Sequence, residues 1–75
     1  MSEAIFVAFG AAAAVVRRTR SEIKRGQLRQ NGWVDALDEI EAVLDFALLT
    51  SYERSIVRGA MISLINQERA LQNTT

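Results

Sequence analysis

The feature that most restricts the fold of this chain is an apolar run close to its start. Residues 4–16, AIFVAFGAAAAVV, are thirteen consecutive positions without a polar side chain. Alanine dominates the run, and apolar and polar residues do not alternate in it, so a helix is the favoured local structure. A helix that is apolar all round is buried all round in a soluble protein. The run therefore predicts a helix that needs neighbours on more than two sides.

The rest of the chain also favours helix, because no proline interrupts it and alanine, leucine, glutamate and arginine fill its long stretches. Asn31 and Gly32 are suited to end the first helix, and Gly26 offers an earlier end. Thr50 and Glu53 have the spacing of a capping box, which marks the start of a third helix. The predicted helices span residues 2–30, 33–49 and 51–72, with a frayed tail at 73–75.

The chain of 75 residues is long enough for one domain, spanning residues 1–75. A domain below ~80 residues buries a small core, and disulfides, a metal or a second subunit commonly reinforce it. The chain contains no cysteine and no histidine, so we expect no disulfide, no metal and no cofactor. We therefore predict an all-α fold, a three-helix antiparallel bundle or a helical hairpin plus a third helix, assembled as a homodimer.

The apolar run carries the predicted dimer contact. Gly10 and Ala14 lie four residues apart, a spacing that lets a second helix approach closely. A three-helix unit offers the first helix only two neighbours, so we expect a second copy of the chain to cover the remaining side. The residues predicted to mediate self-association are Phe6, Val7, Gly10, Ala11 and Ala14.

The other two helices suggest a surface for a different partner. The predicted second helix has an apolar face opposite an acidic one, with Phe46 exposed among the acidic residues. The predicted third helix has a main apolar stripe of Ile56, Val57, Ala60, Leu64 and Leu71. Its apolar surface extends beyond this stripe toward arginines, which favours either contact with both other helices or a face for a partner protein. The predicted partner-binding residues are Phe46, Arg54, Arg58, Met61, Ile62 and Ile65.

Charge is segregated along the chain although the net charge is zero: residues 17–29 carry a net +5 and residues 33–53 a net −6. One interpretation is an ion-paired seam between the first two helices. A hairpin about residues 31–32 would pair Arg29 with Asp35, Arg25 with Asp38 or Glu39, and Arg18 with Asp45. The alternative is a nucleic-acid surface, basic or helix-turn-helix-like. Its candidate contacts are Arg17, Arg18, Arg20, Lys24, Arg25 and Arg29.

Catalysis and membrane insertion are disfavoured. Histidine, the commonest general base, is absent, and no nucleophile elbow, phosphate loop or HExxH pattern occurs, so we expect no enzyme activity. Thirteen apolar residues are fewer than the ~20 that span a bilayer. Glu3 precedes the run and arginines follow it, the reverse of a secretory signal, so a cytoplasmic location is expected.

We predict from these features a small non-catalytic protein–protein interaction module. It would act as a regulatory or inhibitory accessory factor, of the size that phages and mobile elements encode, by binding a partner protein through a helical face. One alternative is a nucleic-acid-binding regulator. A second is a helical protein that lies on a membrane surface, with Arg17, Arg18 and Arg20 reaching the headgroups.

Overall fold

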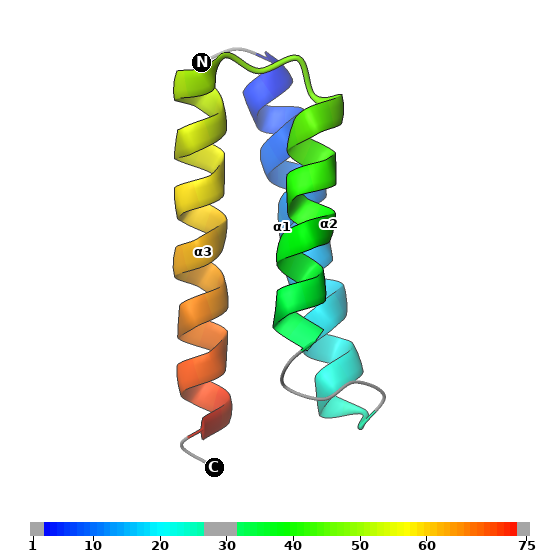
Figure 1. The fold of residues 1–75 in the computed structure, drawn as a ribbon. Coiled ribbons are helices and arrows are strands. Elements are labelled where there is room, and N and C mark those ends of the chain that lie inside the picture. The colour runs from blue at the N-terminus through cyan, green and yellow to red at the C-terminus, as the bar shows by residue number, and fades with distance from the viewer. Residues whose placement is uncertain (1–2, 27–31, 74–75) are drawn as a thin grey trace.

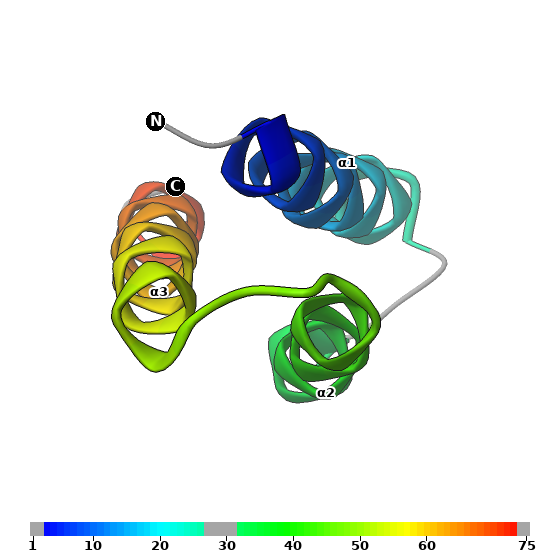
Figure 2. The ribbon, with the colours of Figure 1, turned by 90° about the horizontal axis from the view of Figure 1, so that it is seen from above.

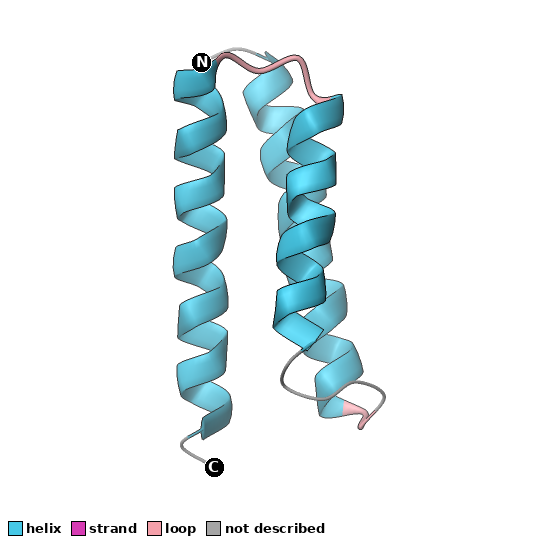
Figure 3. Ribbon diagram, viewed as in Figure 1, coloured by secondary structure: helices cyan, strands magenta, loops and turns pink. Residues whose placement is uncertain are grey.

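The computed structural model describes residues 3–26 and 32–73 and contains three helices (Figures 1 and 3). Helix α1 spans Glu3–Lys24, α2 spans Gly32–Phe46 and α3 spans Ser51–Asn73. No strand occurs in these ranges. The predicted all-α fold with three helices is thereby confirmed.

The three helices lie side by side, each antiparallel to the next along the chain. Seen from one end, they occupy the corners of a triangle (Figure 2). The long dimension of the molecule is 38 Å and the other two are 19 and 16 Å. The start of α1, the end of α2 and the start of α3 consequently lie at the same end of the bundle (Figure 1).

The core is an apolar column to which each helix contributes one face. On α1 small residues dominate this face, and Ala8 and Ala12 are almost completely buried, so the other helices pack close to the α1 backbone there. The second helix buries the face predicted from its amphipathic pattern. The buried hydrophobic residues are Ile5, Ala8, Ala12, Val15, Val16, Trp33, Ala36, Ile40, Leu44, Val57, Met61 and Ile65.

The first helix ends earlier than the favoured prediction. It stops at Lys24 and not at residue 30, and Gly26 adopts a φ of 75°. The Gly26 amide donates a hydrogen bond of 3.0 Å to the carbonyl oxygen of Ile23. Only glycine adopts this left-handed conformation without steric cost, so the earlier stop was the correct choice. The predicted stop at residue 31 lies outside the described residues.

The other helix boundaries follow the prediction more closely. Helix α2 begins at Gly32 and ends at Phe46, three residues before the predicted end. The capping box is confirmed: the Glu53 amide donates to Thr50 Oγ1 at 3.1 Å, and the Thr50 amide donates to Glu53 Oε1 at 3.0 Å. Asn73, placed by prediction in a frayed tail, is the last residue of α3.

The buried face of α3 differs from the predicted stripe. Val57, Met61 and Ile65 point into the core, while Ile56 and Leu71 are exposed. The helix is thus rotated about its axis, with Met61 at the centre of the buried face. In this rotation, arginines of α3 donate hydrogen bonds to carboxylates of α2.

Candidate interaction surface

The six predicted partner-binding residues do not form one exposed face. Met61 and Ile65 are 0% and 2% exposed, because α3 inserts them between α1 and α2. Ile62 is partly exposed on α3 and Phe46 is 90% exposed on α2. The prediction of an exposed Met61 and Ile65 is wrong. The first interpretation of the wide apolar surface, a face in contact with both other helices, describes α3 better.

Arg54 and Arg58 bind carboxylates within the chain. Arg58 donates from Nε to Glu41 Oε1 at 2.6 Å and from Nη2 to Glu41 Oε2 at 2.9 Å. Arg54 donates from Nη2 to Glu41 Oε2 at 3.1 Å and also to Asp45. These bonds join α2 to α3 near the end of the bundle where α2 finishes. We conclude that the two arginines have a role in holding α2 against α3.

The arrangement changes the protonation of Glu41. Its hydrogen bond with Arg58 lowers the pKa of the Glu41 carboxyl below the ordinary 4.5, and Arg54 acts in the same direction, while desolvation opposes them. A carboxyl with a lowered pKa in the folded state stabilises the fold above its unfolded-state pKa, and this contribution disappears as the pH falls through the folded-state pKa.

Replacing Glu41 with glutamine should therefore lower the free energy of unfolding by roughly 0.5–1 kcal/mol at neutral pH, since the pair is partly exposed to solvent. Below pH 4.5 the difference between wild type and variant should shrink. Urea unfolding at neutral and acidic pH measures both effects. Asp38→Asn is the matched control, because Asp38 is exposed on the same helix and forms no ion pair with another described residue. Equal losses in the two variants would contradict the role of Glu41.

The predicted ion-paired seam between the first two helices has a different register. Arg18 pairs with Glu39 on α2, and with Glu22 on its own helix at 3.7 Å, and not with Asp45. Arg25 lies beyond the end of α1 and pairs with neither predicted partner, and Arg29 lies outside the described residues. Because α1 ends six residues before the predicted residue 30, the hairpin turns earlier. Residues level with Arg18 therefore come from the first half of α2.

Some of the candidate nucleic-acid contacts are ion-paired within the chain and others are exposed without such a pair in the described residues. Arg18 is paired with Glu39, and Arg20 donates from Nη1 to Glu68 Oε1 on α3 at 3.1 Å. Arg17, Lys24 and Arg25 are exposed and form no ion pair with another described residue. Two of the six cations thus face carboxylates across helix contacts, which weakens the case for a continuous phosphate-binding surface.

The five residues predicted for self-association are all exposed, on the side of α1 that faces away from the core. The structure distributes them over neighbouring surfaces. Val7 and Ala11 line a groove between α1 and α2, and Phe6 lines a smaller one between α1 and α3. Gly10 and Ala14 lie on the outer face between these grooves.

Exposed apolar side chains gather at one end of the bundle. Ten large hydrophobic residues are exposed in the described ranges, and seven of them lie where α1 starts, α2 ends and α3 starts. We call this surface the apolar end; it consists of Phe6, Val7, Phe9, Phe46, Leu48, Tyr52 and Ile56. Exposed apolar patches of this kind mark interaction sites more often than single exposed residues do.

Sequence reasoning found three of these residues, Phe6, Val7 and Phe46, and missed the others. Leu48 was placed inside the second helix, whereas it lies in the linker to α3 and is 94% exposed. The sequence feature that could have revealed an exposed leucine here is the pair Leu48-Leu49, which stands immediately before the N-cap residue Thr50 of α3. Of these two leucines, Leu49 packs against the core and Leu48 points away from it.

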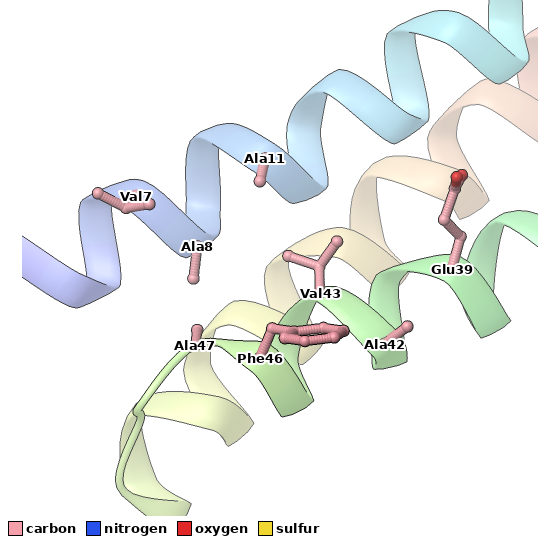
Figure 4. A pocket seen from close by; sticks show the side chains of 8 residues that line it. All are labelled: Val7, Ala8, Ala11, Glu39, Ala42, Val43, Phe46 and Ala47. Carbon is pink, nitrogen blue, oxygen red and sulfur yellow. The ribbon is translucent and has the colours of Figure 1, made fainter.

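The larger groove lies between α1 and α2 and encloses about 450 Å³. Figure 4 shows Ala8 and Ala11 of α1 facing Val43 of α2, with the Phe46 ring beside Val43 on one wall. Glu39 is the single charged residue of the lining and lies at the far end from Ala47 (Figure 4). The groove is open along its length and almost entirely apolar, which suits the apolar face of a helix.

Two further properties concern the described residues alone. None of their helices has the length and hydrophobicity needed to cross a membrane. They also contain no group of three or more carboxylates positioned to hold a metal ion.

Comparison of the chain with protein-family models, with curated proteins and with solved structures finds no match.

Proposed function

We propose that this chain is a non-catalytic protein–protein interaction module that binds a partner protein through the apolar end. The observation that carries the proposal is the concentration there of seven of the ten large hydrophobic side chains that are exposed in the described part of the chain. Burying such a patch against a partner is favourable by roughly 25 cal/mol for each Å² removed from water.

The groove between α1 and α2 indicates the kind of segment that binds. Val7 and Ala11 on one wall and Phe46 on the other present apolar surface, and Glu39 closes one end. An amphipathic helix with apolar residues at helical spacing fits such a surface, and one polar end of that helix would lie beside the Arg18–Glu39 ion pair. A module that acts by occupying a helix of another protein is a regulatory or inhibitory accessory factor.

Serine substitutions at Phe46 and Leu48 test this proposal. Both side chains are at least 90% exposed, so we expect the double variant to fold like wild type by circular dichroism. It should lose at least tenfold in the capture of partner proteins from the native host, because an exposed aromatic anchor typically contributes more than ~1.4 kcal/mol to an interface. The matched control is Val34→Ser, which removes an exposed apolar residue at the other end of α2.

The proposal predicts that the control captures the same proteins as wild type. Unchanged capture by the folded double variant would show that partners bind elsewhere on the chain.

A further inference from the structure

The outer face of α1 carries one acidic and one basic side chain at opposite ends. Glu3 and Arg17 are both exposed on this helix, and neither forms an ion pair with another described residue. They are fourteen residues apart, about 21 Å along the helix, so they cannot pair with each other within one copy. Gly10 lies midway between them.

The residues between these two charges are apolar. At 3.6 residues per turn, Glu3, Phe6, Gly10, Ala14 and Arg17 lie on one side of α1, and all five are exposed. The face thus begins with an acid, ends with a base and is apolar in the middle. This outer face of α1 is defined here by those five residues.

We propose that the outer face of α1 binds the same face of a second copy, with the two α1 helices antiparallel and a two-fold axis passing beside Gly10. This register places Glu3 of each copy opposite Arg17 of the other and thereby forms two equivalent ion pairs. It also sets the large Phe6 against the small Ala14, and the two Gly10 residues face each other on the axis. A parallel pairing would instead set Glu3 against Glu3 and Arg17 against Arg17.

The glycine at the axis supports close approach of the two helices. A Cβ added at Gly10 would meet nothing within 4 Å in a single copy, so packing within the chain does not require glycine there. Glycine inside a helix costs about 1 kcal/mol relative to alanine. Gly59 on α3 is equally open, but its neighbours on that face include Ser55, Ser63 and Asn66, so Gly10 is the glycine set in an apolar face.

The self-complementary charges favour a second copy over an unrelated protein as the occupant. An unrelated partner would have to supply a base and an acid at the matching spacing, whereas a second copy supplies both by symmetry. Phe6 belongs both to this face and to the apolar end and would be buried in the dimer. Phe46 and Leu48 lie on α2 and on the linker, outside this face, and remain available for a partner protein. The inference rests on the proposed function only in treating the chain as an interaction module.

Charge reversal tests the pairing with the full chain. Wild type should sediment as a dimer in analytical ultracentrifugation. Glu3→Lys alone places two bases opposite each other at both ends of the interface, and Arg17→Glu alone places two acids there. Each single variant should therefore raise the dimer dissociation constant about tenfold, with helix content unchanged by circular dichroism.

Mixing the two single variants should restore association, because a mixed dimer has an acid opposite a base at both ends. One variant then carries only bases on this face and the other only acids, so the mixture is complementary in either orientation. The weakening of each single variant is what identifies the antiparallel register, because a parallel wild-type dimer already sets like charges against each other at both ends. A wild-type chain that sediments as a single copy at every concentration would overturn the proposal. So would a mixture that associates no better than its components.

A steric pair of variants provides an independent measurement. Gly10→Leu fills open space in a single copy, so it should leave the fold intact and dissociate the dimer. Gly59→Leu makes the same change in equally open space on α3 and should leave the dimer intact. A folded Gly10→Leu variant with wild-type dimer affinity would overturn the proposal. Both tests of the dimer measure the mass of the assembly, whereas the test of the proposed function measures capture of partner proteins. A failed dimer proposal can therefore be told apart from a failed partner-binding proposal.

Discussion

Replacing Trp33 with alanine is expected to lower the free energy of unfolding by about 3–5 kcal/mol, the usual range for truncating a buried large aromatic residue. Trp33 is 1% exposed and is among the largest fully buried side chains. Its Nε1 also donates a hydrogen bond of 3.2 Å to Gln72 Oε1 near the end of α3. A domain of this size has a total stability of about 4–11 kcal/mol, so the loss is a large share of it and the variant should unfold at a clearly lower urea concentration than wild type.

Urea unfolding followed by circular dichroism measures this effect, since Trp33 is the sole tryptophan and its fluorescence disappears in the variant. Val34→Ala is the control, because Val34 is the next residue of α2 and is exposed; its effect should stay within about 0.5 kcal/mol. Similar losses at the two positions would mean that α2 does not bury the Trp33 face.

Replacing Met61 with alanine should lower the free energy of unfolding by about 2–5 kcal/mol, because the smaller side chain leaves a cavity among all three helices. Met61 is completely buried, whereas its neighbour Ile62 is 40% exposed. Ile62→Ala should therefore have a clearly smaller effect. Thermal or urea unfolding of the two variants decides which side of α3 faces the core. A larger loss at Ile62 would contradict the observed rotation of α3.

Met61 shows why sequence reasoning misassigned part of the surface. Apolar residues occur around much of α3, so helical periodicity alone is compatible with several rotations of this helix about its axis. In the observed rotation Arg54 and Arg58 meet Glu41, which is thirteen and seventeen positions away from them in the chain. Such long-range pairs are absent from any local pattern.

The register between α1 and α2 has a similar explanation. The two candidate stops, Gly26 and residues 31–32, are both compatible with a helix end, and the choice moves the turn by several residues. Once α1 ends at Lys24, Arg18 lies level with Glu39. A local choice at one glycine thus decides which charges meet along the whole hairpin.

The amino-acid pattern alone was enough to predict the helical class of the fold, the Thr50 capping box, the buried face of α2 and the exposure of Phe46. These properties depend on residues within one or two helical turns of each other, and local propensity and periodicity report them directly. The rotation of α3, the partners of the arginines and the gathering of seven apolar side chains at one end became known only from the packing of the three helices. Those properties depend on which helices meet and at what register, and that choice is made by packing and ion pairs between residues far apart in the chain.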